Sequence, residues 1–217
     1  MFSVLDMFTI GVGPSSSHTV GPMCAAQAFA SSLEESGAVS RVGRIRVVLY
    51  GSLSLTGLGH GTDRAILAGL EGNVPATVDT DYLLSVRERC AHDGTIHVNG
   101  TNAIAYDDDG DMVFDRWKRL APHPNGMRFQ AFDAQGNIID EQVWYSIGGG
   151  FIRRGRIDDA LISNHEQTPA SSQSPEDSGN DEAAEYGDGV PYPFVSCDGL
   201  IDLCRKHHLS IDRKSVV

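Results

Sequence analysis

The chain has 217 residues, of which 41% are hydrophobic, and its formal net charge is −12. A chain of this length and hydrophobic content can bury the core of one domain and leave further residues outside it. No stretch has the run of about 20 apolar residues that a membrane helix needs, and the N-terminus lacks the pattern of a signal peptide. Eleven of the acidic residues lie between Ile157 and Cys204, and the rest of the chain carries 18 acids against 17 bases, so no basic patch is present for nucleic acid. We therefore expect a soluble cytoplasmic protein that binds neither nucleic acid nor membrane.

The first predicted element is a helix over residues 23–37, which follows the run "GVGPSSSHTVGP" at residues 11–22. Pro22 lacks an N–H and belongs in the first helical turn, which places the N-cap between Thr19 and Gly21. Ser15 to His18 are thus expected in a loop just ahead of the helix. Gly37 ends the helix, and its apolar face repeats at Met23, Ala26, Phe29, Ala30 and Leu33.

A second junction between a loop and a helix follows. Residues 44–55, "RIRVVLYGSLSL", are apolar and typical of a strand, and a glycine-dense loop with His60 at its centre then leads into a short helix that begins at Thr62 or Asp63. Residues 79–94 predict another helix.

Alternating patterns then predict two hairpins, residues 102–115 turning at Asp109-Gly110 and residues 126–150 turning near Gln135-Gly136. Helices followed by hairpins indicate an α+β fold, with helices packed on a largely antiparallel sheet. "SIGGG" at residues 146–150 lacks the lysine of a P-loop and is interpreted as a tight turn.

The acidic segment is rich in Ser, Pro and Gly, which predicts a disordered linker and a domain boundary near Ser163. Helical periodicity returns afterwards, at Leu200, Ile201, Leu203 and Cys204. We expect a domain over residues 1–160, a linker over 161–193 and the truncated start of a second domain over 194–217.

The run of three serines, His18 and Thr19 permits three interpretations. A nucleophile with its base is disfavoured, because such a serine sits on a G-x-S-x-G elbow and an adjacent histidine rarely reaches it. An anion cradle is favoured by hydroxyls and free N–H groups at a helix N-terminus. The third interpretation, serines that only cap and turn, stays open.

His60 is interpreted either as an ordinary surface histidine or as a group that moves protons, because its flanking glycines let the backbone approach a ligand closely. The sequence does not show that the two junctions meet. The four cysteines, Cys24, Cys90, Cys197 and Cys204, form no CxxC pair, and no metal site is predicted in this chain.

Three stretches together resemble the N-terminal β domain of bacterial iron–sulfur L-serine dehydratase: "SVLDMFTIGVGPSSSHTVGPM", "GSLSLTGLGHGTDRAILAGLEG" and "YSIGGGFI". The resemblance covers about residues 2–155, and "LIDLCRKHHLSI" is similar to the opening helix of that family's catalytic α domain. The resemblance implies a fold like the substrate-binding regulatory domain of some D-3-phosphoglycerate dehydrogenases.

The family converts L-serine to pyruvate and ammonium, a reaction of amino-acid metabolism and gluconeogenesis, with a four-iron, four-sulfur cluster as Lewis acid. The resemblance implies that Ser15, Ser16, Ser17, His18 and Thr19 bind the substrate, chiefly its carboxylate, and that His60 is a candidate base.

The family's cluster cysteines belong to the α domain, where this chain departs from the family: its own cysteines do not match those ligands, and the final "DRKSVV" differs from the expected continuation. We therefore expect no bound cluster and no lyase activity from the chain alone. Two hypotheses remain: the substrate-binding half of an L-serine ammonia-lyase that needs an α catalytic domain in cis or in trans, or a stand-alone module that binds amino acids. Either is compatible with a homodimer.

Overall fold

The computed structural model describes residues 11–163 and 197–206 and divides the chain into two compact units, residues 1–168 and 169–217. In the second unit, α6 (Cys197–Lys206) is the described element, and it agrees with the helical periodicity of the sequence. Within the described ranges no helix is long and apolar enough to cross a membrane.

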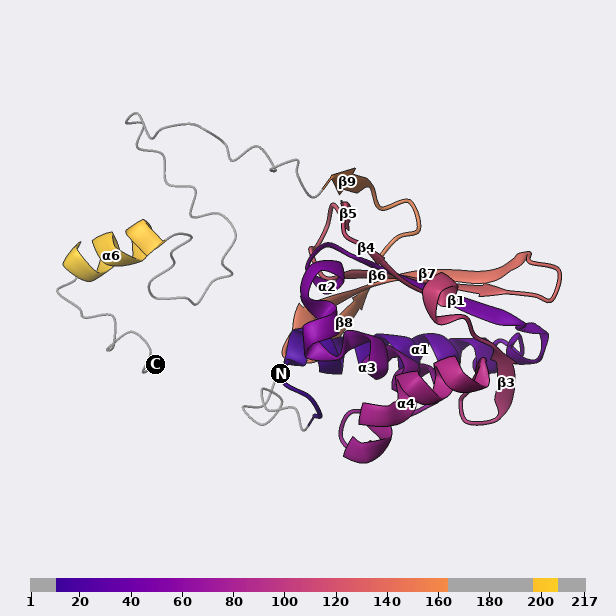
Figure 1. Ribbon diagram of the computed structural model, residues 1–217. Helices are drawn as coiled ribbons and strands as arrows, with labels where there is room; N and C mark the ends of the chain where they lie inside the picture. Colours follow the sequence, from indigo (N-terminus) through magenta and orange to yellow (C-terminus); the bar gives the residue numbers. More distant parts are fainter. Residues whose placement is uncertain (1–10, 164–196, 207–217) are drawn as a thin grey trace. The chain divides into compact units, whose positions relative to one another are not determined.

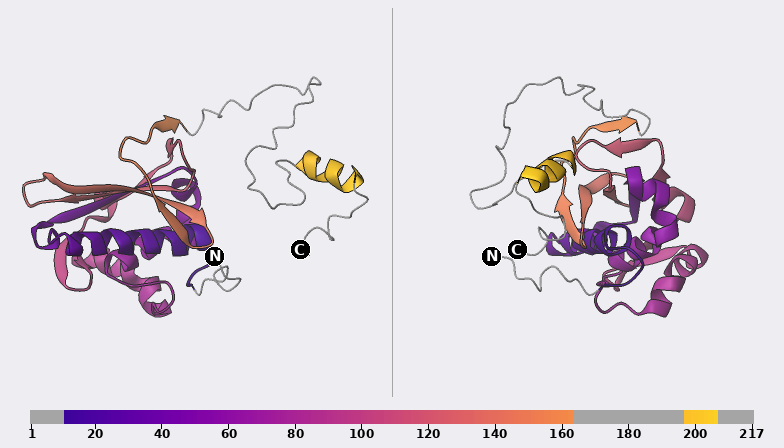
Figure 2. Two further views of the ribbon diagram at one scale, coloured as in Figure 1. Left: turned by 180° about the vertical axis from the view of Figure 1, so that it is seen from behind. Right: turned by 90° about the vertical axis from the view of Figure 1, so that its left-hand side faces the viewer.

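The first unit has an α+β architecture in which helices pack against one face of a mixed, largely antiparallel sheet (Figures 1 and 2). Its helical elements are η2 (Ser16–Val20), α1 (Gly21–Glu35), η3 (Val39–Arg41), α2 (Gly51–Thr56), η4 (Gly57–His60), α3 (Thr62–Leu70), α4 (Thr80–Asp93) and α5 (Asp108–Asp111). Its strands are β1 (Arg44–Tyr50), β2 (Thr95–Val98), β3 (Asn102–Ala105), β4 (Met112–Asp115), β5 (Lys118–Leu120), β6 (Gly126–Phe132), β7 (Ile138–Gly148), β8 (Phe151–Arg154) and β9 (Leu161–Ser163).

The main sheet has the order β2-β3-β1-β6-β7-β8. Strands β3 and β4 both pair in parallel with β1, β3 at Arg44 and β4 from Val47 to Tyr50, whereas the pairs β1–β6, β6–β7, β7–β8 and β2–β3 are antiparallel. The short strands β5 and β9 form a separate antiparallel pair.

The core lies between the sheet and helices α1 and α3, with α4 packed outside α3 (Figure 1). Alternate residues of β1 divide between two clusters: Ile45, Val47 and Leu49 join the helices, and Val48 and Tyr50 pack with the second cluster on other residues of the sheet. This alternation is the period of two that a strand imposes on its side chains. β1 is therefore buried on both of its faces near its carboxyl end, where the chain continues into α2.

Most predicted elements are confirmed. The first helix ends before Gly37, which has a φ of +68°, and its N-cap is Val20, inside the predicted interval. Helix α3 begins at Thr62, and α4 begins after the N-cap Asp79, whose side chain accepts the N–H of Tyr82. The hairpin at Gly136 and the glycine turn after Ser146 are also present.

Three local predictions are wrong. The strand predicted over residues 44–55 ends at Tyr50, because Gly51 adopts a φ of +56° and starts helix α2. Residues 102–115 form no hairpin: α5 occupies the predicted turn, and β4 pairs with β1. The serines expected in a loop before α1 are partly wound into η2, a π-helical turn that continues directly into that helix. In the second case, pairing with a distant strand overrides the local alternation.

Candidate functional site

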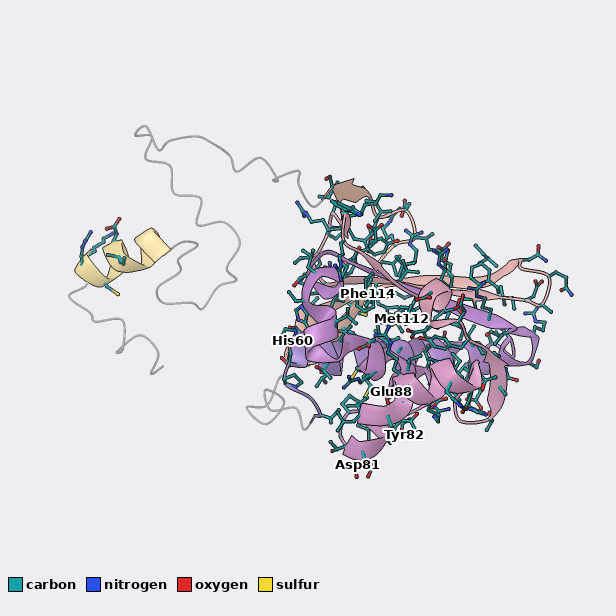
Figure 3. The ribbon with its side chains drawn as sticks, in the orientation of Figure 1. His60, Asp81, Tyr82, Glu88, Met112 and Phe114 are labelled. Atoms are coloured by element: carbon teal, nitrogen blue, oxygen red, sulfur yellow. The ribbon has the colours of Figure 1, made fainter. Side chains whose placement is uncertain are left out.

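The two polar junctions meet at the carboxyl end of β1. The Thr19 hydroxyl donates to the His60 carbonyl oxygen at 2.8 Å, and the Thr62 hydroxyl donates to the carbonyl oxygen of His18. Both threonines are buried, at 1% and 0% exposure. These reciprocal bonds join segments about forty residues apart in the sequence, so the site has a fixed backbone frame. In Figure 3, His60 lies at the same end of the unit as α2.

The imidazoles of His18 and His60 are neighbours, with ring centroids 5.0 Å apart. Burial lowers the pKa of His18 from its ordinary 6.5, and the adjacent His60 lowers it further because two positive charges would repel. His18 is therefore neutral near pH 7 and does not supply the positive charge that a protonated imidazole would bring to an anion.

Both ring nitrogens of His18 are bonded to hydroxyls. Nδ1 lies 2.8 Å from the Ser17 Oγ, and Nε2 lies 3.0 Å from the Ser52 Oγ. The sequence alone does not indicate Ser52, because residues 44–55 have the pattern of one strand. The signal that could have found it is the pair Gly51-Ser52 at the end of an apolar run, where a glycine allows a sharp turn.

The tautomer of neutral His60 follows from its partner. Its Nδ1 lies 3.0 Å from the Thr56 carbonyl oxygen, which can only accept, so Nδ1 carries the proton. Among the described residues, no hydrogen-bond partner is found for Nε2, which keeps its lone pair. This geometry suits a group that takes a proton from a ligand.

The three serines differ in their surroundings. The Ser15 Oγ accepts the N–H of His18 at 3.2 Å as the N-cap of η2, and it lies 3.4 Å from the Ser17 Oγ. Ser16 is exposed, whereas Ser15 and Ser17 are half-buried. Thr19 is buried with its hydroxyl bound to His60, so here it joins the two segments. The π-helical form of η2 is notable because such wide turns are frequent at functional sites.

The glycine-rich stretch at residues 145–152 begins at the end of β7, which packs against η2. Ser146, at the end of β7, is fully buried, and a Cβ on Gly21 would lie 2.1 Å from its Oγ and 2.8 Å from its Cβ. The Ser146 hydroxyl has no hydrogen-bond partner within the described structure. Only glycine at position 21 lets the start of α1 approach β7 this closely.

An ion-pair network holds α3 behind the site. Arg87 of α4 pairs with Asp63, whose side chain is 4% exposed, and with Asp108 at 2.8 Å. Tyr106 donates to Asp108 at 2.7 Å. Hydrogen bonds from Arg87 lower the pKa of Asp108 despite its partial burial. Because Asp63 follows Thr62 directly, this network fixes the N-terminus of α3.

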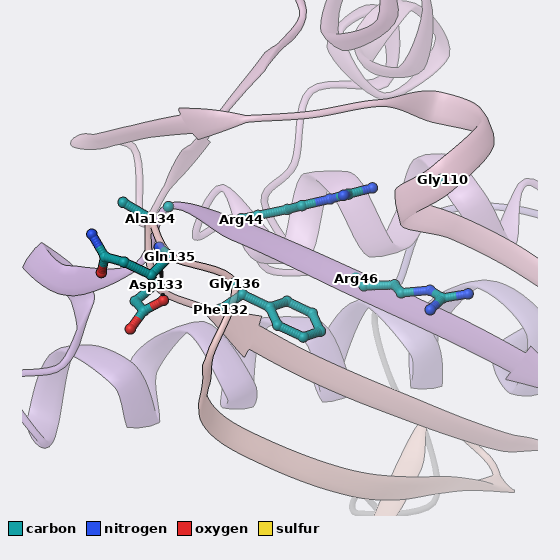
Figure 4. Close-up of a pocket in the computed structure, with 9 residues that line it drawn as sticks. Arg44, Arg46, Gly110, Phe132, Asp133, Ala134, Gln135 and Gly136 are labelled. Carbon is teal, nitrogen blue, oxygen red and sulfur yellow. Dashed lines mark hydrogen bonds between the residues drawn. The ribbon is translucent and has the colours of Figure 1, made fainter.

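Two cavities lie near the ends of β1. One of about 280 Å³ adjoins His60, and its wall includes Pro14, Thr19, His60, Arg64, Thr80 and Leu83. A larger one of about 620 Å³ lies at the opposite end of β1 around Arg44 and Arg46 (Figure 4). There Arg44 is paired with Asp111, and none of the site residues expected from the sequence lines it. Thr19 and His60 line the smaller cavity, whereas Ser15, Ser16, Ser17 and His18 are not among its lining residues. We therefore place the candidate site at the junction of η2 with the His60 loop, beside this cavity.

The described residues do not fit an iron–sulfur cluster. Among them, no three His, Cys, Asp or Glu side chains are grouped so that they could hold a metal ion. Burial raises the pKa of the Cys24 thiol, and burial with nearby acids raises that of Cys90 to about 11. A cluster needs thiolates, which these surroundings disfavour. His207 and His208, which follow Cys204 closely in the sequence and are also possible metal ligands, lie outside the described residues.

Comparison with known proteins identifies the family of the chain. Residues 3–156 match the family model described as "Serine dehydratase beta chain". The chain is 41% identical to the L-serine dehydratase of Streptomyces coelicolor over 209 residues, which are 96% of this chain and 42% of that protein. It is 40% identical to L-serine dehydratase 1 of Escherichia coli over 215 residues, 97% of this chain and 41% of that protein. The chain thus spans about two fifths of the length of these relatives.

Proposed function

The chain belongs to the serine dehydratase beta chain family, and from this premise we propose that it is the substrate-binding part of an L-serine ammonia-lyase that converts L-serine to pyruvate and ammonium. The observation that carries the proposal is the junction of η2 with the His60 loop, where two threonine hydroxyls join the segments and the rings of His18 and His60 lie 5.0 Å apart. The names of the relatives support the substrate.

In this proposal the substrate carboxylate is bound by the hydroxyls of Ser15, Ser16 and Ser17 and by N–H groups at the start of η2. Hydroxyls in several geometries can donate to a carboxylate, and the helix dipole favours the negative charge there. His18 orients Ser17 through its Nδ1. Thr19 acts indirectly, because its hydroxyl positions the His60 backbone.

His60 would take the proton from the Cα of serine. Its Nδ1–H is held by the Thr56 carbonyl, which leaves Nε2 to accept that proton. The family's iron–sulfur cluster, which would act as a Lewis acid on the serine hydroxyl, does not fit the described residues of this chain. We propose that an α catalytic domain, in cis or in trans, holds it.

Three finer expectations belong to the same proposal: a fold like the regulatory domain of D-3-phosphoglycerate dehydrogenase, a cytoplasmic location and a homodimer. They stay predictions.

The test is calorimetric titration of the chain with L-serine, compared with Ser16→Ala and His18→Ala. Weak binding that both substitutions abolish supports a site completed by a second domain. Tight binding supports the alternative, a stand-alone module. Unchanged affinity in both variants contradicts the carboxylate site. The chain should form no pyruvate from L-serine after anaerobic reconstitution with iron and sulfide; pyruvate formation would overturn the need for another domain.

A further inference from the structure

The Ser52 hydroxyl is the hydrogen-bond partner of His18 Nε2, and it makes none of the substrate contacts proposed above. We propose that Ser52 is a positioning residue: its hydroxyl donates to Nε2 of His18, selects the tautomer protonated at Nδ1, and so frees the Ser17 hydroxyl to donate to a carboxylate. This inference deepens the proposed function. Its statement about carboxylate binding rests on that function, whereas its statement about the His18 tautomer does not.

The backbone of Ser52 is anchored on both sides. Its N–H donates to the Pro124 carbonyl oxygen at 2.9 Å, and its own carbonyl accepts the Thr56 hydroxyl at 3.0 Å. Gly51 makes this approach possible, because its φ is +56° and a Cβ there would lie 2.3 Å from the Pro124 oxygen. The Ser52 hydroxyl is therefore presented to His18 by a fixed turn.

The hydroxyls and the ring form one continuous chain, from Ser15 through Ser17 and His18 to Ser52, with separations of 3.4, 2.8 and 3.0 Å. A neutral imidazole has one N–H and one acceptor nitrogen, so only two arrangements pair both nitrogens. In the first, Ser17 donates to Nδ1 and the Nε2–H donates to Ser52. In the second, Ser52 donates to Nε2 and the Nδ1–H donates to Ser17.

Only one of these arrangements is compatible with a bound carboxylate, because a carboxylate only accepts hydrogen bonds. In the first arrangement the Ser17 proton is committed to the ring, so Ser17 has nothing to offer the ligand. In the second the ring proton satisfies the Ser17 oxygen, and the hydroxyl proton of Ser17 is free. The second arrangement requires a donor at Nε2, and among the described residues Ser52 is the one that reaches this atom.

The test measures the ring nitrogens of His18 by ¹⁵N NMR above pH 7, in the full chain, with and without L-serine. With and without serine, the wild type should show a protonated Nδ1 and an acceptor Nε2, because Ser52 donates to Nε2 in both states. Ser52→Ala should lose that preference already in the free protein, and it should bind serine about 3- to 10-fold more weakly, the effect of one net hydrogen bond. Ser52→Thr, which keeps the hydroxyl, should restore both properties.

Ser54→Ala is the matched control, because Ser54 lies on the same helix and its hydroxyl bonds to the Gly51 carbonyl oxygen instead of His18. It should leave the His18 tautomer unchanged. The inference is overturned if Ser52→Ala keeps the wild-type ¹⁵N shifts, if Ser54→Ala alters them equally, or if serine binds with Nε2 protonated. If the wild type binds no serine, the proposed function fails, and the comparison of free proteins still decides the role of Ser52.

Discussion

Replacing Gly21 by alanine tests whether the start of α1, which continues η2, packs directly against β7. Gly21 has a φ of −58°, so alanine can adopt its backbone conformation without strain. The new Cβ would lie 2.1 Å from the Ser146 Oγ and 2.8 Å from the Ser146 Cβ. Both distances are shorter than a Cβ contact allows, so the start of α1 must move from the sheet and take η2 with it.

The expected magnitude follows from two opposing effects. Overpacking a buried site costs about 1–3 kcal/mol, and exchanging glycine for alanine in a helix recovers at most about 1 kcal/mol. The free energy of unfolding should therefore fall by about 1–2 kcal/mol. Ser146→Ala alone removes a buried hydroxyl without a partner and should be neutral or stabilising by up to about 1 kcal/mol.

The assay is urea denaturation of the wild type, both single variants and the double variant. Because Ser146→Ala removes the closer of the two contacting atoms, the double variant should be more stable than additivity predicts, by about 1 kcal/mol. Serine affinity should fall in Gly21→Ala and recover partly in the double variant. Additivity within about 0.3 kcal/mol would refute the direct contact between Gly21 and Ser146.

Gly51→Ala should lower the free energy of unfolding by at least about 2 kcal/mol, because the new Cβ clashes with the Pro124 oxygen and the backbone has a left-handed φ that alanine disfavours. Gly59→Ala should be neutral, because a Cβ there meets nothing within 4 Å. Equal effects of the two substitutions in urea denaturation would contradict this prediction. Arg87→Met should cost about 3 kcal/mol by leaving the buried Asp63 unpaired, and adding Asp63→Asn should recover part of it; a loss below about 1 kcal/mol would show that the pair is not needed. Because the pKa of His18 is lowered in the folded state, the unfolded state gains the proton first as pH falls below 6.5, so stability is full above 6.5 and decreases until the folded pKa is passed. Relative to His18→Gln, the wild type should lose stability over this window, and a constant difference between the two would contradict the lowered pKa.

Local sequence signals predicted the helices of this domain well. Pro22 and Gly37 marked the limits of the first helix, and Asp79 and Gly94 bracket α4 as a cap and a left-handed stop should. These features depend on residues within one or two turns of each other. For the same reason the sequence predicts the starts of α1 and α3, whereas it does not predict η2 or α2.

Long-range pairing could not be predicted in this way. Residues 112–115 alternate like one arm of a hairpin, yet they pair with β1, more than sixty residues earlier. The turn at Gly51 depends on contact with Pro124, and the bond from Ser52 to His18 exists only because that turn forms. The sequence thus indicated Ser15 to Thr19 and His60 separately, and only the fold shows that they meet.

The central claim is that the η2 segment and the His60 loop form one site for L-serine. The most direct measurement is a ¹H–¹⁵N NMR titration of the full chain with L-serine that follows the amides of Ser15 to Thr19 and of His60. The account predicts saturable shifts at both segments with a single dissociation constant. Shifts confined to the cavity at Arg44 and Arg46, or no shifts at saturating serine, would contradict it.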